Sequence, residues 1–275
     1  MSEPEAEPDR YGLVGMPVAH SRSPMIHQIF ARLTGENMTY ELIEASAEEF
    51  ETAVRGFAAA GGKGLNVTVP HKEAAYELCR NRGAAAEAAG AVNTISVRGN
   101  MLFGDNTDGI GFIRDLTANK GRDPADREIL VLGAGGAARG ILGPLLEAGP
   151  GRLVIANRTE ERAVALRDEV AGDLPVEICR FDELDTAGPF DFVINATSAG
   201  LRGESMPFPE SIVGAESFCY DLVYGTKTTP FVDWALAAGA NDAVHGWGML
   251  VEQAAESFRI WRDVSPDTSG LIQNG

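Results

Sequence analysis

A glycine-rich turn near the middle of the chain has the spacing of a dinucleotide-binding site. Residues 133–138 read Gly-Ala-Gly-Gly-Ala-Ala and directly follow the apolar run 129–132. In such a turn Gly133 permits a tight bend, Gly135 lets the backbone approach a pyrophosphate, and the small Ala138 lets the following helix lie close to the strand. The phosphates are expected at the positive end of that helix. A plain glycine-rich loop is the alternative, but the strand-turn-helix context favours a dinucleotide.

A basic turn about 20 residues further on indicates which dinucleotide is bound. Asn157, Arg158 and Thr159 follow the apolar run 152–156, where an NAD-selective site puts Asp or Glu on the ribose hydroxyls. None of these side chains is a carboxylate. Arg158 can pair with a 2′-phosphate, while Asn157 and Thr159 supply uncharged donors. The pattern predicts NADP rather than NAD, against the alternative of a solvated arginine at the start of a helix.

Two serines near the start of the chain precede a proline, in the sequence His-Ser-Arg-Ser-Pro over residues 20–24. With Ser23 as the N-cap and Pro24 at the first helical position, the local sequence favours ordinary helix capping. The hydroxyls of Ser21 and Ser23 could also receive a ligand carboxylate, because they would lie beside the positive end of the same helix.

Lys72 and Asp108 are ionisable residues that could act on a ligand, although each has a plainer explanation. Lys72 comes just past the strand-like run 64–69, where the ligand sites of α/β sheets form. A solvent-exposed lysine is the usual alternative. Asp108 lies in the polar turn 104–109 and could simply cap a helix. For either residue in isolation, the plainer explanation is favoured.

The remaining histidines and cysteines give no metal-ligand spacing, so no metal site is expected. The three cysteines are odd in number and widely spaced, which is typical of reduced core residues. His20 and His71 are predicted to make structural hydrogen bonds, and His27 to pack in its helix or at a rim. His245 is explained equally well by a turn or by a loop near a cofactor.

Strand-like runs alternate with helical stretches along the whole chain, which predicts an α/β fold. The first series of strands is expected at 11–14, 40–43, 64–69, 91–97 and 101–103. After a polar turn, the second series is expected at 128–132, 152–156, 176–180, 192–195 and 217–221. The alternation in the second series predicts a parallel doubly wound sheet, with a helix over 139–147 behind the glycine turn.

A chain of 275 residues exceeds the usual size of one hydrophobic core, so two domains are predicted. The first is an N-terminal α/β domain formed by 1–112 together with 247–275, because the last helix is expected to return to it. The second is a Rossmann-type domain over 113–246.

The charge of the chain restricts its partners. Acidic residues outnumber basic ones by 40 to 23, and the resulting charge of −17 would repel nucleic acid and anionic membrane surfaces. No apolar run approaches the roughly 20 residues that cross a bilayer. We therefore expect a cytoplasmic monomer or homodimer with neither nucleic acid nor membrane partners. Adaptation to a salt-rich cytoplasm is one hypothesis for the acidic surface, and a merely acidic protein is the other.

Considered together, these motifs resemble those of the shikimate dehydrogenase family. The N-terminal blocks are Gly-Met-Pro over 15–17, residues 20–24 with His27, Asn-Val-Thr-Val-Pro-His-Lys over 66–72, Gly-Ala-Val-Asn-Thr over 90–94, and Gly-Asp-Asn-Thr-Asp-Gly over 104–109. The later blocks are 133–140, 157–159, 195–198, 220–224 and 248–253. They run in order from Tyr11 to about Trp261, so the resemblance covers nearly the whole chain.

The resemblance implies an oxidoreductase that uses NADP to interconvert 3-dehydroshikimate and shikimate, in aromatic amino-acid biosynthesis. The N-terminal domain and the last helix would bind shikimate, and the middle domain would bind NADP. Lys72 would supply the proton to the developing oxyanion, and Asp108 would orient it and the substrate.

Further roles follow from the resemblance alone. Ser21 and Ser23 would hold the substrate carboxylate, with Tyr224 bordering it, which overrides the local preference for capping. The ring hydroxyls would be bound by Thr68, Lys72, Asn93, Asp108 and Gln253. The cofactor contacts would be Gly133, Ala134, Gly135, Gly136, Ala137, Asn157, Arg158, Thr159, Thr197, Leu222, Gly246 and Met249. For Met249, an ordinary core methionine is an equally good explanation.

Two other functions compete with this one. A quinate/shikimate dehydrogenase would accept a saturated ring and often NAD, and Arg158 argues against the NAD form. A catalytically silent NADP-binding regulator could be built on the same fold, because fold does not imply function. The presence of Lys72 and Asp108 opposes it.

Overall fold

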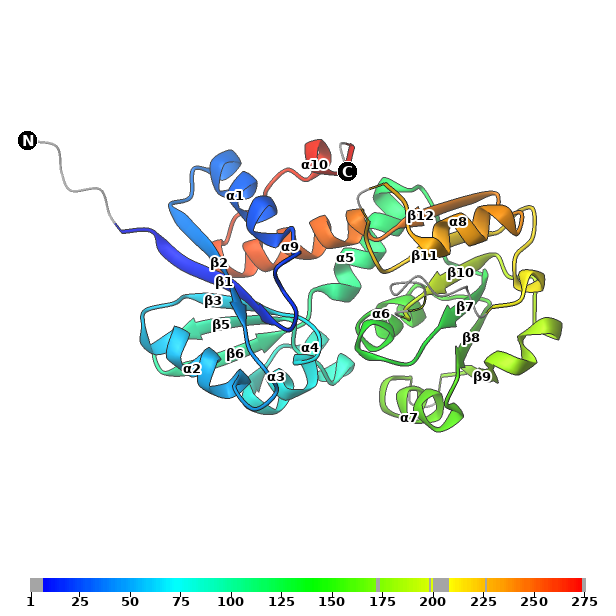
Figure 1. Cartoon of the computed structure of the whole chain (residues 1–275), viewed down its shortest axis with the longest axis horizontal. Coiled ribbons are helices and arrows are strands. Elements are labelled where there is room, and N and C mark those ends of the chain that lie inside the picture. The colour runs from blue at the N-terminus through cyan, green and yellow to red at the C-terminus, as the bar shows by residue number, and fades with distance from the viewer. Residues whose placement is uncertain (1–6, 172–173, 198, 200–207, 226, 274–275) are drawn as a thin grey trace, which may run out of the picture. The chain divides into compact units, whose positions relative to one another are not determined.

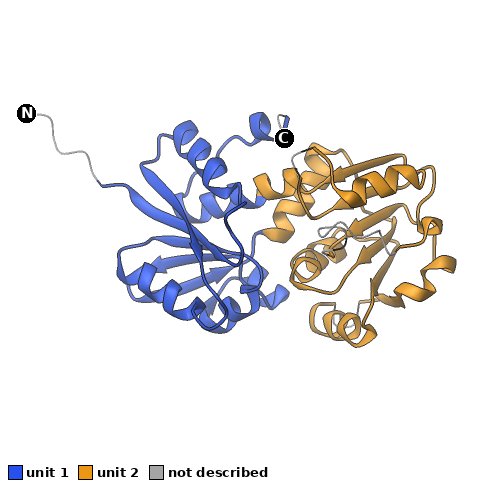
Figure 2. Cartoon of the chain, viewed as in Figure 1, with its two compact units in different colours: residues 1–107, 253–274 blue, residues 108–252, 275 orange. Residues whose placement is uncertain are grey.

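The computed structural model describes residues 7–171, 174–197, 199, 208–225 and 227–273. The chain folds into two compact units, shown in different colours in Figure 2. Unit 1 comprises 1–107 and 253–274, and unit 2 comprises 108–252 and Gly275. The boundaries at 112/113 and 246/247 were predicted for a substrate-binding and a cofactor-binding domain. This division by function stays a prediction.

Unit 1 is built on a mixed sheet in the order β2-β1-β3-β5-β6-β4. Its strands are β1 (Asp9–Gly15), β2 (Met38–Glu44), β3 (Gly64–Val67), β4 (Asn81–Arg82), β5 (Thr94–Arg98) and β6 (Met101–Asp105). β1 is parallel to both β2 and β3, whereas β5 is antiparallel to β3 and β6. The expected strand pair at 91–97 and 101–103 is therefore confirmed as the β5–β6 hairpin, in which Arg98 pairs with Met101.

Helices cover both faces of this sheet (Figure 1). The helices of unit 1 are α1 (Ser23–Thr34), α2 (Phe50–Ala59), α3 (Lys72–Leu78), α4 (Ala84–Ala89) and α10 (Ser269–Gln273), with the later part of α9 (Trp247–Arg262). On one face, Phe50, Val54 and Phe57 of α2 pack with Val14 and Leu65 of the strands.

The second face of this sheet is covered by α1 and α9. The Trp261 ring stacks on Tyr11 with centroids 4.7 Å apart, and its indole N–H donates to the Ile95 carbonyl at 3.1 Å. The predicted return of the last helix to the first unit is thus observed as packing within unit 1.

Unit 2 is an open parallel sheet in the order β12-β11-β10-β7-β8-β9. Its strands are β7 (Glu128–Leu132), β8 (Arg152–Asn157), β9 (Glu177–Arg180), β10 (Phe192–Asn195), β11 (Phe218–Asp221) and β12 (Asp242–His245). The doubly wound Rossmann-type prediction is confirmed. The sequence did not reveal β12, because it is short, only two of its residues are apolar, and all four are only partly buried, as at the edge of a sheet.

The central strands of this sheet are buried on both faces, and alternate residues point to opposite sides. On β7, Ile129 and Val131 join one core, and Leu130 and Leu132 join the other. The helical elements of unit 2 are α5 (Asp108–Arg114), which continues as the π-helix η1 (Asp115–Asn119), α6 (Gly136–Glu147), α7 (Glu160–Val170), the 3-10 helices η2 (Phe181–Thr186) and η3 (Glu210–Ile212), and α8 (Pro230–Ala237). None of the helices in the described ranges is long and apolar enough to cross a membrane.

Candidate functional site

The turn after β7 lies where the strand order of unit 2 reverses. β7 pairs with β8 on one side and with β10 on the other, and open α/β sheets bind ligands at the carboxyl ends of strands at such a switch point. The Gly133 N–H donates to the Ala156 carbonyl at 2.7 Å, and the Ala196 N–H donates to the Leu132 carbonyl at 2.8 Å. The glycine turn is therefore held between the ends of β8 and β10.

Gly133 occupies a backbone position that excludes other residues. Its φ is +104°, in the region that favours glycine. A Cβ atom at this position would lie 2.9 Å from Cγ2 of Thr197 and 3.0 Å from the Ala196 carbonyl oxygen. The predicted role of Gly133 in a tight bend is confirmed, and Thr197 is brought against the turn.

The helix behind the turn begins earlier than expected. The sequence placed its start at 139, whereas α6 begins at Gly136 with Gly135 as the N-cap. A Cβ atom on either Gly135 or Gly136 would meet nothing within 4 Å, so open space lies over the helix N-terminus. Ala138 is fully buried, as expected for close packing of helix on strand. This arrangement fits a pyrophosphate at the positive end of α6.

We expect the Gly133→Ala substitution to lower the free energy of unfolding by about 1–3 kcal/mol, because alanine at this φ is strained and its Cβ meets Thr197. Urea titration of the ligand-free protein measures the change. Gly136→Ala is the matched control, because it adds a methyl group in open space at the start of a helix, and its urea midpoint should not fall. A Gly133→Ala midpoint equal to that of the wild type would contradict the steric reason.

The basic turn follows β8 at the same edge of the sheet. The Asn157 amide donates to the Thr159 carbonyl at 2.8 Å, and Thr159 is the N-cap of α7 without a side-chain capping bond. Arg158 is exposed and forms no ion pair with any described residue. Its guanidinium is therefore available for an anionic ligand, which fits a 2′-phosphate.

Arg162 is a second basic residue here that sequence reasoning missed. It lies in the first turn of α7, where its backbone N–H donates to the Thr159 carbonyl at 3.2 Å. Like Arg158, it is exposed and forms no ion pair within the described part of the chain. The spacing Arg158-x-x-x-Arg162, across the start of a helix, was the available signal.

The ends of β10, β11 and β12 bring the other predicted cofactor residues of unit 2 together. The Leu222 N–H donates to the Asn195 carbonyl at 2.9 Å, and the Gly246 N–H donates to the Val223 carbonyl at 3.0 Å. A Cβ atom on Gly246 would lie 2.5 Å from the Leu222 carbonyl oxygen, so only glycine fits. Leu222 and Gly246 are thus adjacent.

Met249 and Tyr224 lie near these loops. Met249 is 9% exposed and packs with Tyr220 in the core that faces α6, which agrees with the core-methionine alternative. Its contact with a cofactor stays a prediction. Tyr224 is half-buried, and its ring meets that of Trp247 at a centroid distance of 6.5 Å.

The serine pair of unit 1 does not cap its helix as the local sequence suggested. α1 begins at Ser23 itself, its N-cap is Arg22, and no side-chain capping bond is formed there. Instead, the Ser21 hydroxyl accepts the Ser23 N–H and donates to the Ser23 hydroxyl, both at 3.2 Å. The capping interpretation with Ser23 as N-cap is therefore wrong, because the serines bond to each other.

A buried polar network continues from Ser23 into unit 1. The Tyr40 hydroxyl donates to Oδ1 of Asn66 at 2.8 Å, and burial raises the pKa of Tyr40 while a hydrogen bond with Ser23 lowers it. The Asn66 amide donates to the hydroxyls of Ser257 and Thr94 at 2.9 and 3.2 Å. Ser257 comes from α9, so the network joins α1, β2, β3, β5 and the last long helix.

Asn93 and Gln253 lie at the other end of this network. The Asn93 amide donates to the Thr107 hydroxyl at 3.0 Å, and Oδ1 of Asn93 accepts the Thr107 N–H at 2.9 Å. The Thr107 hydroxyl reaches Oε1 of Gln253 at 3.4 Å. Unit 1 thus links four predicted substrate residues, Ser21, Ser23, Asn93 and Gln253, through one set of hydrogen bonds.

Thr68 and Lys72 lie just beyond β3 in unit 1. The Thr68 N–H donates to the Val14 carbonyl at 3.0 Å, and its side chain lies where a Cβ of Gly15 would be. Lys72 is the first residue of α3, and its carbonyl accepts the Val92 N–H at 2.9 Å, directly beside Asn93.

Asp108 follows Thr107 directly and is the first residue of α5 in unit 2. It is 6% exposed, and a Cβ on Gly140 of α6 would lie 3.0 Å from its Cβ. Lys72 and Asp108 therefore belong to different units, and their joint action on one ligand stays a prediction.

Comparison with known proteins agrees with these features. Residues 13–95 match the model of the shikimate dehydrogenase substrate binding domain, 115–202 match shikimate / quinate 5-dehydrogenase, and 246–273 match the shikimate 5′-dehydrogenase C-terminal domain. The chain belongs to the shikimate dehydrogenase family.

Individual members of the family show how closely it is matched. Shikimate dehydrogenase (NADP(+)) of Alkalilimnicola ehrlichii is 53% identical, over 96% of this chain and 97% of the relative. The structure of Aquifex aeolicus shikimate dehydrogenase matches with a TM-score of 0.88 and 32% identity, over 99% of both chains. Shikimate 5-dehydrogenase of Thermus thermophilus, solved in complex with NADP(H) and shikimate, matches with a TM-score of 0.86 and 35% identity, over 97% of this chain and 98% of that chain.

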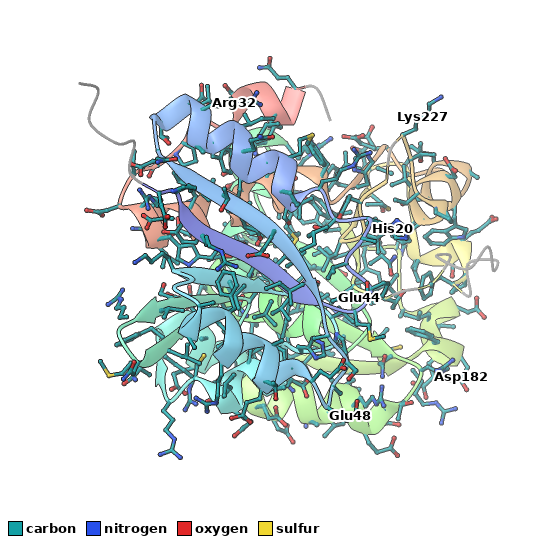
Figure 3. The ribbon with its side chains drawn as sticks, turned by 60° about the vertical axis from the view of Figure 1, so that its left-hand side comes forward. His20, Arg32, Glu44, Glu48, Asp182 and Lys227 are labelled. Atoms are coloured by element: carbon teal, nitrogen blue, oxygen red, sulfur yellow. The ribbon has the colours of Figure 1, made fainter. Side chains whose placement is uncertain are left out.

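Of the three histidines near the start of the chain, His27 and His71 are buried and make structural contacts, whereas His20 is exposed. Nε2 of His71 lies 2.8 Å from the Ala45 carbonyl oxygen, so the predicted structural bond is confirmed. His27 is fully buried and stacks on Tyr40 with centroids 4.3 Å apart, and burial lowers its pKa to about 3. His20, labelled in Figure 3, is exposed on the segment between β1 and α1 and makes no side-chain hydrogen bond with the described residues. The structural interpretation therefore has no support for His20.

Proposed function

We propose that this chain catalyses the reversible NADPH-dependent reduction of 3-dehydroshikimate to shikimate, in aromatic amino-acid biosynthesis. One observation carries the proposal. A single chain of this family contains both a glycine turn at the switch point of a parallel sheet, in unit 2, and a buried polar network, in unit 1. Relatives with the name shikimate dehydrogenase (NADP(+)) match nearly the whole chain, and the similar Thermus thermophilus protein was solved with both ligands.

Unit 2 would bind the cofactor along the carboxyl edge of its sheet. The pyrophosphate would lie over Gly135 and the start of α6, where the helix dipole and free N–H groups favour an anion. The unpaired guanidinium groups of Arg158 and Arg162 would receive the 2′-phosphate. A carboxylate at Asn157 would repel that phosphate, and the uncharged amide found there does not.

Unit 1 would bind the substrate. The hydroxyls of Ser21 and Ser23, at the positive end of α1, suit a carboxylate. Asn93 and Gln253 present amide groups whose orientation is fixed by Thr107, which suits the ring hydroxyls. Because these groups are held by one another, little side-chain entropy would be lost on binding.

In the proposed reaction, NADPH supplies a hydride to the substrate carbonyl carbon when it is bound. Lys72 then donates a proton to the carbonyl oxygen as negative charge develops there, which lowers the barrier. In this proposal Asp108 accepts a hydrogen bond from the substrate hydroxyl. In the reverse direction Lys72 takes the proton back. The chain itself supplies an acid group for this step, since a protonated lysine suffices.

We further propose that the enzyme is cytoplasmic. Cys79, Cys179 and Cys219 are all free, which suits a reducing compartment. No group of three or more His, Cys, Asp or Glu side chains in the described ranges is arranged to hold a metal ion.

A single assay tests the proposed function. The purified chain is supplied with shikimate or quinate and with NADP or NAD, and reduced nicotinamide is followed by absorbance. We expect rapid reduction of NADP with shikimate and much slower reduction in the other three combinations. Equal rates with quinate and NAD would favour the quinate/shikimate alternative. Tight binding of NADPH without turnover of either acid would favour a silent regulator.

A further inference from the structure

Asp221 is a buried carboxylate at the carboxyl edge of the sheet in unit 2. It is the last residue of β11 and is 2% exposed. In register it lies between Asn195, the last residue of β10, and His245, the last residue of β12. It therefore lies at the same edge as the switch point, one strand beyond β10, and it is not among the residues predicted to contact the cofactor.

Among the residues that the structure describes, the partners of Asp221 are all uncharged. Oδ1 accepts the Asn195 amide at 2.9 Å and the Val223 N–H at 3.1 Å. Oδ2 accepts the Thr229 hydroxyl at 2.6 Å. Thr229 is the N-cap of α8, where its hydroxyl accepts the Val232 N–H at 3.3 Å. A buried carboxylate without a cationic partner is costly, so its presence calls for a reason beyond stability.

The hydrogen bond to Asn195 fixes the direction of that amide. Because Nδ2 of Asn195 is directed to Asp221, Oδ1 is directed to Thr197, where it accepts the hydroxyl at 2.6 Å and the backbone N–H at 3.1 Å. The Thr197 hydroxyl in turn accepts the Ala199 N–H at 3.0 Å. The Thr197 methyl group lies against Gly133, so this relay ends on the glycine turn.

The same carboxylate holds the loop after β11. Its bond to the Val223 N–H holds the backbone of the loop between Leu222 and Tyr224. The Leu222 N–H is bonded to the Asn195 carbonyl, and the Val223 carbonyl accepts the Gly246 N–H at 3.0 Å. One side chain thus connects the loops after β10, β11 and β12 with the start of α8.

We propose that Asp221 is a positioning residue of the cofactor site: acting through Asn195 and Val223, its carboxylate holds Thr197 and Leu222 in the arrangement that binds the nicotinamide dinucleotide. This inference rests on the proposed function only for the identity of that ligand. The connected loops lie at the carboxyl edge, where sheets of this kind bind their ligands. A function in positioning these loops would explain why a destabilising buried charge is present.

The ionisation of Asp221 supports this role and supplies a readout. Burial raises its pKa to about 6, although its hydrogen bonds with Thr229, Val223 and Asn195 lower it. The carboxylate is therefore charged above about pH 6 and takes up a proton below it. The ionisable groups around it are Tyr220 on its own strand, Asp115 bonded to Tyr220, His245 on β12 and Asp233 in the first turn of α8.

The test compares the dissociation constant of NADPH, measured by fluorescence titration, for the wild type and Asp221→Asn. At pH 8 the variant should bind about tenfold more weakly, because the amide cannot accept all three hydrogen bonds. The 2′-phosphate of NADPH itself takes up a proton near pH 6, so the readout is the ratio of the two constants. This ratio should fall toward one at pH 5, where wild-type Asp221 is also neutral.

Asp191→Asn is the matched control. Asp191 precedes β10 at the opposite edge of the same sheet, where Oδ2 accepts the Glu128 N–H at 2.8 Å. Its neutral variant should bind NADPH as the wild type does. A loss of NADPH affinity confined to Asp221→Asn would therefore not result simply from removing one negative charge from this sheet.

Two further variants keep the inference testable if Asp221→Asn does not fold. Thr229→Val removes one donor to the carboxylate and should weaken NADPH binding several-fold, whereas Thr229→Ser should restore it. Combining Thr197→Val with Thr229→Val should cost less than the sum of the two single effects, because part of each effect passes through Asn195.

The possible failures are distinguishable. Equal NADPH binding by the wild type and Asp221→Asn at pH 8, or a ratio that does not change with pH, would overturn the positioning role. A wild type that binds NADPH and yet does not oxidise shikimate would overturn the proposed function and leave the positioning role standing.

Discussion

Replacing Lys72 with alanine is expected to lower kcat for shikimate oxidation by about 100- to 10,000-fold, the usual contribution of a positioned general acid or base. KM for shikimate should change by less than about threefold, because the serines and amides that we propose as ligand-binding groups remain in place. Steady-state kinetics in both directions measures the two constants. An interaction made in the transition state affects kcat in this way, whereas lost ground-state binding would raise KM.

Lys63→Ala is the matched control, because Lys63 is an exposed lysine of the same unit that precedes β3. It should retain wild-type kcat and KM. If Lys72→Ala also retained wild-type turnover, the proton would have to come from another group, and the proposed role of Lys72 would be refuted.

Replacing Arg158 with alanine is expected to raise KM for NADP by about 10- to 150-fold, because one charge-assisted hydrogen bond to a phosphate contributes about 1.5–3 kcal/mol. KM for NAD should change by less than about twofold, since NAD has no 2′-phosphate. The experiment measures both constants at fixed shikimate. Arg162→Ala should act in the same direction.

Arg167→Ala is the control for charge alone. Arg167 lies on the same helix as Arg162 but pairs with Asp168 at 2.7 Å, so its loss should leave both constants unchanged. Equal increases in KM for NADP and NAD in Arg158→Ala would show that Arg158 stabilises the fold of the turn and does not select the cofactor.

Local patterns predicted those parts of the fold in which neighbouring residues determine the structure. The strand, glycine turn and helix around Gly133 follow from short-range spacing, and the observed φ of +104° agrees. The start of α6 was misplaced because Gly135 and Gly136 have no side chain to reveal a helical pattern. β12 was missed because its burial is only partial and its residues do not form an apolar run.

The supporting residues of the site could not be predicted from sequence, because their partners are far apart along the chain. Asn66 bonds to Tyr40 across 26 residues and to Ser257 across 191. Asp221 likewise contacts Asn195 across 26 residues. No local periodicity encodes such pairs. At the serines, a local pattern gave a wrong prediction. The sequence favours Ser23 as an N-cap, but in the structure the two serine hydroxyls bond to each other.

The last long helix determines the order in which the two units can finish folding during synthesis. Ser257 closes the polar network around Asn66, Trp261 stacks on Tyr11, and Arg262 bonds to Asp9 and Glu36 near the start of the chain. A ribosome therefore delivers every strand of unit 2 before it delivers these closing contacts of unit 1. The nascent chain is expected to complete the fold of unit 2 first, and to close the core of unit 1 only after residues 257–262 have left the ribosome.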